Sequence, residues 1–172
     1  MRLDLFKARA QQMTADQQIS MILKACDLAG RHGWSVDLYV PGRTCLDIAV
    51  SLERASCPIT VAHMGYLTHA EGITDAECEH FVDVVRESRR IWPKLSGAYR
   101  YGPGPGQARA QMLARALLRA APTRVLWGSD WPHVMAPAQD SGVLLQNAAQ
   151  HAIEPRDLYA MLVENPATLY GF

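Results

Sequence analysis

Short apolar segments alternate with amphipathic segments along the chain, and this alternation constrains the fold more than any other feature. The apolar segments recur about every 30 residues and are rich in β-branched and aromatic residues: 3–6, 35–40, 59–64, 92–98 and 124–129. Strands that alternate with helices are typical of βα units around a parallel sheet, whose strands are covered on both faces. We therefore expect an α/β fold.

Segments with helical periodicity lie between and after these strands. Thr14 with Gln17 and Thr74 with Glu77 form capping boxes, and Pro155 is a favoured first residue of a helix. We expect six helices, over residues 16–31, 44–55, 74–85, 107–121, 141–152 and 155–164.

One segment, residues 102–106, is rich in proline and glycine and follows a strand, where a phosphate loop would also lie. Its prolines lack the N–H donors that a phosphate cradle needs. We interpret it as a mobile active-site loop or a plain connector.

Charge and hydropathy exclude several classes of protein. The 17 basic and 17 acidic side chains cancel, so the chain lacks the basic surface of nucleic-acid or membrane binders. No apolar run approaches the ~18 residues of a membrane helix, and the N-terminus has no signal-peptide hydrophobic region. The four cysteines lack C-x-x-C spacing and are expected to be buried thiols rather than disulfides or zinc ligands. We expect a cytoplasmic protein.

Polar side chains follow the predicted strands at the points where the strands end: Tyr39, His63, Arg100, Asp130 and His133. In a parallel βα fold these ends meet at one edge, where chemistry takes place. Each residue also has a structural interpretation. The histidine could be a satisfied core group, the aspartate a turn or capping residue, the tyrosine a packing residue and the arginine a surface residue.

Together these residues favour hydrolysis. A carboxylate can take a proton from water as the water attacks a carbonyl carbon, and we predict Asp130 as this general base. His63 is expected to polarise the carbonyl oxygen or bind a metal, while Tyr39 and Arg100 hold a substrate carboxylate or hydroxyl. His133 follows Asp130 by three residues and could reach the same edge. No Gly-x-Ser-x-Gly elbow supports a serine hydrolase.

Four motifs carry a resemblance to a known family: 61–65 (VAHMG), 94–97 (KLSG), 126–133 (LWGSDWPH) and 165–172 (NPATLYGF). In this order and spacing they resemble the amidohydrolase superfamily, and in particular its branch of dicarboxylate and sugar lactonases. The WGSDWPH string is the most specific of them.

The resemblance implies a (β/α)8 TIM barrel that hydrolyses a lactone or a similar cyclic ester of a small carboxylic or sugar acid. It implies that Asp130 ends the eighth strand as catalytic base and that His63 ends the sixth, near the substrate carbonyl or a metal. Tyr39 and Arg100 occupy substrate-binding positions of that branch. Lys7 stands where the lactonase has a substrate-binding arginine; it keeps the charge but loses the bidentate fork.

The superfamily also carries a His-x-His pair after its first strand, and this chain has none. The first strand here corresponds to the fourth of the barrel. Whole barrels run to ~250 residues. We therefore expect residues 1–172 to form a single domain with the last five βα units, strands 4–8, and to lack the N-terminal strands.

Several alternatives stay open. Besides the lactone hydrolase, the chain could be a metal-dependent decarboxylase or amidohydrolase of the same superfamily. It could also be a catalytically silent fragment whose exposed sheet edges pair with another copy. The cofactor is either none or one divalent metal such as zinc, held by His63 and Asp130, although a catalytic zinc usually has three protein ligands. A flavodoxin-like binding module is disfavoured because no phosphate loop follows the first strand.

Overall fold

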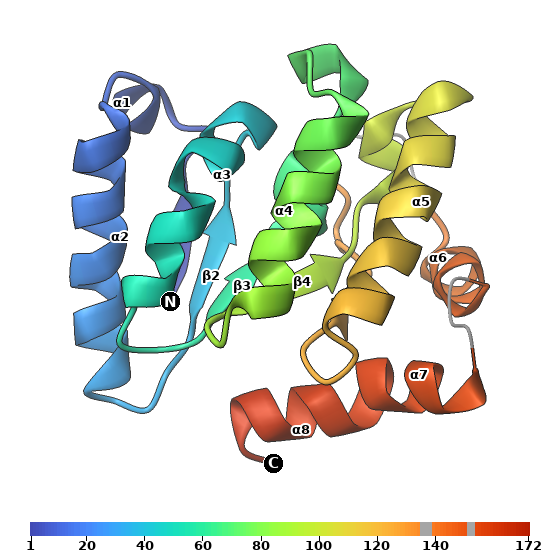
Figure 1. Ribbon diagram of the computed structural model, residues 1–172. Helices are drawn as coiled ribbons and strands as arrows, with labels where there is room; N and C mark the ends of the chain where they lie inside the picture. The colour runs from blue at the N-terminus through green and yellow to red at the C-terminus, as the bar shows by residue number, and fades with distance from the viewer. Residues whose placement is uncertain (135–138, 151–153) are drawn as a thin grey trace.

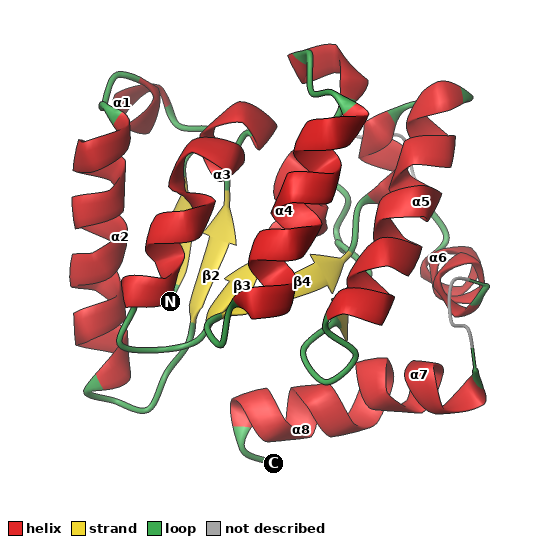
Figure 2. Cartoon of the chain, in the orientation of Figure 1, coloured by secondary structure: helices red, strands yellow, loops and turns green. Residues whose placement is uncertain are grey.

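Five parallel strands form one sheet in which the spatial order follows the order along the chain. The structure, a computed structural model, describes residues 1–134, 139–150 and 154–172. The strands are β1 (Arg2–Asp4), β2 (Val36–Tyr39), β3 (Ile59–Val61), β4 (Ile91–Leu95) and β5 (Leu126–Trp127), and they are yellow in Figure 2. Each strand pairs with the next, as where Leu38 lies opposite Leu3 on one side and Val61 on the other.

Helices cover one face of this sheet. Figure 1 shows α2, α3, α4 and α5 in a row in front of the strands, with α7 and α8 crossing below them. The α-helices are α1 (Ala8–Gln11), α2 (Ala15–Gly30), α3 (Gly42–Ala49), α4 (Asp75–Glu87), α5 (Pro105–Ala120), α6 (Ser141–Ala149), α7 (Pro155–Tyr159) and α8 (Asn165–Tyr170). In the part of the chain that the structure describes, no helix has both the length and the apolar character to cross a membrane.

The hydrophobic core lies between the helices and the sheet. Apolar strand residues such as Leu38, Val61 and Ile91 are fully buried against helix residues such as Ile22 and Phe81. All four cysteines are free thiols in buried positions, as the sequence predicted. Burial of this apolar surface provides the main favourable term in folding.

The opposite, inner face of the sheet carries polar side chains. Asp37, Thr60 and Lys94 come from three neighbouring strands, β2, β3 and β4. Asp37 Oδ1 accepts a hydrogen bond of 2.6 Å from Thr60 Oγ1 and one of 2.8 Å from Lys94 Nζ. Burial opposes the ionisation of Asp37, but the Lys94 ammonium outweighs it and holds the pKa of the carboxyl below its usual value. This polar layer links the strands below the edge where they end.

The sequence predicted an α/β fold made of the last five βα units of a (β/α)8 barrel. The parallel sheet, with its strands in chain order, confirms this prediction. Both predicted capping boxes form. The Thr14 side chain accepts from Gln17 N, the Thr74 side chain accepts from Glu77 N, and each N3 side chain bonds back to the threonine backbone.

Element boundaries differ from the predictions at functionally important places. The third strand ends at Val61 rather than residue 64, and the fifth spans two residues rather than 124–129. The predicted loop 102–106 ends early because Pro105 already begins α5. The helix expected over 155–164 continues through a π-helical segment, Ala160–Glu164, into α8. Residues 151 and 152 of the predicted sixth helix lie outside the described residues.

Candidate active site

An aspartate held by two donors stands at the centre of the polar cluster where the strands end. Asp130 lies three residues after β5, and its Oδ2 accepts hydrogen bonds of 2.6 Å from the Tyr99 hydroxyl and 2.7 Å from Arg100 Nε. Both donors lie on the short 3₁₀ helix Ala98–Tyr101, which follows β4. The other oxygen, Oδ1, lies 3.6 Å from His63 Nε2. The turns after three strands, β3, β4 and β5, therefore meet at one carboxylate.

The turn after β3 positions His63. The chain leaves the strand through Ala62–Tyr66, in which His63 and Met64 have φ of 52° and 54°. Left-handed backbone is uncommon for residues other than glycine and concentrates at functional sites. The Tyr101 hydroxyl supports the turn by donating a hydrogen bond of 3.0 Å to the carbonyl oxygen of His63. The His63 ring is buried, with Nε2 directed to Asp130.

Burial and hydrogen bonding give His63 and Asp130 different charge states at neutral pH. Burial lowers the pKa of His63 to about 4, although the Asp130 carboxylate favours protonation. Burial also opposes ionisation of Asp130, but the hydrogen bonds from Tyr99 and Arg100 outweigh it and keep the pKa of Asp130 below its usual value. At neutral pH the site therefore holds an ionised carboxylate beside a neutral imidazole.

Aromatic rings form one wall of the cluster. The Tyr39 ring, at the end of β2, meets the His63 ring edge-on with centroids 5.3 Å apart and packs on Phe6 at 4.4 Å. Tyr66 approaches the same three rings. Burial raises the pKa of the Tyr39 phenol, so its hydroxyl is a neutral hydrogen-bonding group at physiological pH.

Two other predicted site residues lie differently. The ring of His133 is buried, its Nε2 is 3.0 Å from the Ser129 carbonyl oxygen, and it meets the Tyr99 ring at 6.0 Å. One ring nitrogen of His133 is thus used to hold the turn after β5. The Lys7 side chain is exposed at the N-cap of α1 and makes none of the described contacts that join the central cluster.

Sequence reasoning missed two members of the cluster, Ser96 and Tyr99. Both lie in the segment that contributes Arg100, after the same strand. Tyr99 bonds Asp130, while Ser96 Oγ lies 2.9 Å from His63 Nδ1. The available signal was their position, because every polar side chain just after a parallel strand is a candidate for this edge.

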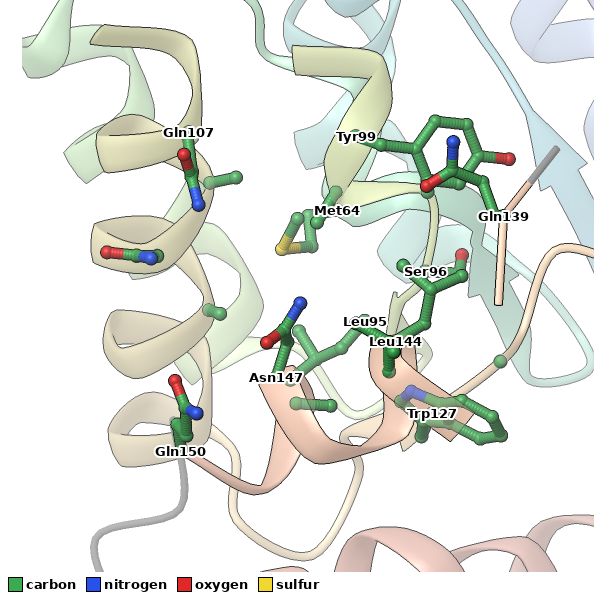
Figure 3. Close-up of a pocket in the computed structure, with 18 of the residues that line it drawn as sticks. Met64, Leu95, Ser96, Tyr99, Gln107, Trp127, Gln139, Leu144, Asn147 and Gln150 are labelled. Atoms are coloured by element: carbon green, nitrogen blue, oxygen red, sulfur yellow. The ribbon is translucent and has the colours of Figure 1, made fainter. Parts of the chain in front are cut away.

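A pocket of about 560 Å³ lies beside the cluster, between α5 and α6. Figure 3 shows Met64, Ser96 and Tyr99 on one side of it and Leu144 and Asn147 of α6 on another. Apolar and amide side chains dominate its lining, and none of the described lining residues is a lysine or arginine. An anionic substrate group is therefore expected at Arg100 rather than in this pocket.

The described residues do not fit a catalytic zinc ion. Zinc in catalytic sites takes three protein ligands, and no group of three or more His, Cys, Asp or Glu side chains in residues 1–134, 139–150 and 154–172 could hold a metal ion. The guanidinium of Arg100 also bonds Asp130 directly and would repel a cation there. No chemical step is therefore assigned to a metal.

A parallel sheet in chain order, with a carboxylate and an imidazole meeting at the carboxyl ends of its strands, is the arrangement found in part of a (β/α)8 barrel. The sequence profile of the Amidohydrolase family matches residues 11–172. The chain belongs to this family.

Curated relatives and solved structures agree with this assignment. The chain is 29% identical over 147 residues to a 4-sulfomuconolactone hydrolase of Hydrogenophaga intermedia, an alignment that covers 83% of this chain and 48% of that protein. It is 29% identical over 158 residues to a 2-pyrone-4,6-dicarboxylate hydrolase of Comamonas testosteroni, covering 84% and 52%. The chain thus spans about half the length of the curated relatives it matches.

Two solved structures share the fold at lower identity. A protein of Agrobacterium tumefaciens superposes with a TM-score of 0.78 at 23% identity, over 90% of this chain and 56% of that one. A probable 2-pyrone-4,6-dicarboxylic acid hydrolase of Acinetobacter baumannii, with citric acid bound, gives 0.75 at 23% identity, over 99% and 63%.

Proposed function

We propose that the chain is a lactone hydrolase that opens a cyclic ester of a small carboxylic acid without a metal. The observation that carries this proposal is the Asp130–His63 pair. One carboxylate oxygen is held by Tyr99 and Arg100, and the other faces the neutral imidazole at 3.6 Å. The names of the relatives, which are hydrolases of lactones, support the same chemistry.

The proposed reaction needs one water and one proton carrier. Asp130 takes a proton from water as the water oxygen attacks the carbonyl carbon of the lactone. The neutral imidazole of His63 polarises the carbonyl oxygen and stabilises the tetrahedral oxyanion. The ring C–O bond then breaks, and the proton moves from Asp130 to the leaving oxygen. The product is an open hydroxy acid, and Asp130 is ionised again.

Arg100 and the aromatic wall around Tyr39 are proposed to bind the substrate. Arg100 uses Nε for Asp130 and Nη2 for the Val134 carbonyl oxygen, at 3.1 Å. A guanidinium has five N–H donors, and in the described residues Nη1 bonds none of the acceptors, so this edge is proposed to bind a substrate carboxylate. The Tyr39 ring provides an apolar contact and a hydroxyl. His133 and Lys7 are proposed as outer contacts to the substrate.

The test is turnover by the purified chain of the two lactones that appear in the names of the relatives, 4-sulfomuconolactone and 2-pyrone-4,6-dicarboxylate. Loss of a general base costs about 10²–10⁴-fold, so Asp130→Asn is expected to reduce kcat by at least 100-fold. The matched control is Asp83→Asn, at an exposed aspartate on α4, which is expected to retain activity. A chain that turns over neither lactone contradicts the proposal and favours a catalytically silent protein.

We also propose that copies of the chain associate through the sheet edges. β1 and β5 each pair with one neighbour only in the described sheet, and unpaired strand edges favour pairing with another chain. Sedimentation velocity is expected to show a dimer or larger species whose proportion rises with concentration. A monomer at all concentrations would contradict this part of the proposal.

A further inference from the structure

The histidine of the candidate site is held by a serine hydroxyl on the neighbouring strand end. Ser96 follows β4, and its Oγ accepts a hydrogen bond of 3.2 Å from the backbone N–H of His63. The same oxygen lies 2.9 Å from Nδ1 of the His63 ring. Both side chains are buried, at 6% and 4% exposure, so water does not compete freely for these groups.

Hydrogen-bond satisfaction decides which atom donates in the contact between ring and hydroxyl. A serine hydroxyl has one proton and two acceptor sites. One acceptor site is used by the backbone N–H of His63. Among the described residues, the contact with the His63 ring is the one hydrogen bond in which the Ser96 hydroxyl can act as the donor, and Nδ1 is therefore its protein acceptor. A proton on Nδ1 instead would leave the largely buried hydroxyl proton without an acceptor among the described residues, which is unfavourable.

The backbone around the ring enforces the same orientation. Gly97 has φ of 59°, and a Cβ at this position would lie 2.6 Å from His63 Nδ1. The glycine therefore permits the chain to close over Nδ1, while Nε2 faces Asp130 at 3.6 Å. Nδ1 is enclosed by Ser96 and Gly97, and Nε2 is the nitrogen available to a substrate.

We infer that Ser96 is a positioning residue that fixes His63 as the Nε2–H tautomer and so makes it a hydrogen-bond donor to the substrate carbonyl. The proton on one ring nitrogen is set by the hydrogen bond that the other nitrogen makes. In this tautomer Nε2 carries the ring proton and is a hydrogen-bond donor. The donation to a substrate carbonyl rests on the proposed hydrolysis, whereas the tautomer is a property of the protein without substrate.

The test is a long-range ¹H–¹⁵N NMR spectrum of the ¹⁵N-labelled 172-residue chain near neutral pH, in which a protonated ring nitrogen resonates apart from an unprotonated one. The His63 signals are assigned by their loss in His63→Gln. We expect the Nε2–H pattern in the unmodified chain. An Nδ1–H pattern there would overturn the inference, whatever the variants do.

Two variants at position 96 test the role of the hydroxyl. Ser96→Ala removes the donor to Nδ1 and is expected to shift His63 toward the Nδ1–H tautomer, whereas Ser96→Thr keeps a hydroxyl and is expected to keep Nε2–H. An unchanged Nε2–H pattern in Ser96→Ala would overturn the assignment of Ser96. If the alanine variant does not fold, the unmodified chain and the threonine variant still decide the question.

Kinetics separate this inference from the proposed hydrolysis. Outer partners of metal-bound histidines change activity by about 10–100-fold, and we expect Ser96→Ala to lower kcat within a similar range and to leave KM unchanged. A rise in KM with constant kcat would contradict a positioning role. If the chain shows the Nε2–H pattern but opens no lactone, the proposed function fails while the tautomer assignment stands.

Discussion

At the scale of single residues, the neutral imidazole of His63 beside the ionised carboxylate of Asp130 determines how the site responds to acid. Protonation of His63 places an imidazolium beside the Asp130 carboxylate. The positive charge makes this carboxylate a weaker base toward water. Because burial lowers the pKa of His63 to about 4, the acidic limb of the rate profile is expected near pH 4. An ordinary histidine would place this limb near its usual pKa of ~6.5.

The pH–rate profile of lactone opening checks this expectation. With kcat measured at saturating substrate, activity is expected to be constant from neutral pH down to about pH 5 and then to fall. A limb centred near pH 6.5 would show that His63 is readily protonated in the folded protein and would contradict the charge states assigned to the site.

The same residue couples folding to pH. A histidine whose pKa is lower in the folded state binds its proton first in the unfolded chain, so acidification favours unfolding between pH 6.5 and about 4. The free energy of unfolding is expected to fall by about 2 kcal/mol between pH 7 and pH 5 from this group alone. Urea unfolding of His63→Gln is expected to lack this contribution, whereas His69→Gln, at an exposed histidine, retains it. Equal pH dependence in the two variants would rule out the coupling.

At the scale of elements, the turns after the strands carry the backbone strain of the described chain. The described non-glycine residues with positive φ all lie after β3 or β5: His63, Met64, Tyr66, Asp130 and His133. Such backbone persists where surrounding contacts hold it, and it gathers at functional sites. The two central residues of the site are both among them.

These turns also explain what the sequence could and could not predict. The capping boxes were predictable because Thr14 and Thr74 carry a local signal three residues before Gln17 and Glu77. The end of β3 was not, because the left-handed turn begins at two residues other than glycine, His63 and Met64, and such backbone is uncommon outside glycine. The carboxylate–imidazole pair was predictable from its place after two strands. Its hydrogen bonds to Tyr99 and Ser96 depend on side-chain geometry that no local pattern encodes.

The start of α5 offers a test of packing at this scale. A Cβ on Gly106 would lie 1.8 Å from the carbonyl oxygen of Tyr101, so Gly106→Ala forces the backbone apart and is expected to destabilise the protein by about 3 kcal/mol. Gly30→Ala is the control, since its Cβ would meet the nearest atoms at 3.6 Å, and it is expected to be neutral or slightly stabilising. Thermal or urea unfolding measures both. Equal stability of the two variants would contradict the close approach at residue 106.

At the scale of the whole molecule, the five βα units contribute the proposed general base, the histidine and an arginine from the ends of three neighbouring strands. The chain spans about half the length of the relatives, and turnover by the 172-residue chain itself tests whether these five units are sufficient for activity. On the inner face of the sheet, below the cluster, Asp37 of β2 and Lys94 of β4 form an ion pair of 2.8 Å.

We expect Asp130 to activate water for direct attack on the lactone carbonyl, and a single turnover in ¹⁸O-labelled water tests this role. With enzyme in excess over lactone, we expect the label to appear in the new carboxylate of the product and the peptide containing Asp130 to keep its ordinary mass. Incorporation of ¹⁸O into the Asp130 peptide would show that this residue attacks the substrate itself. That result would contradict its role as a general base.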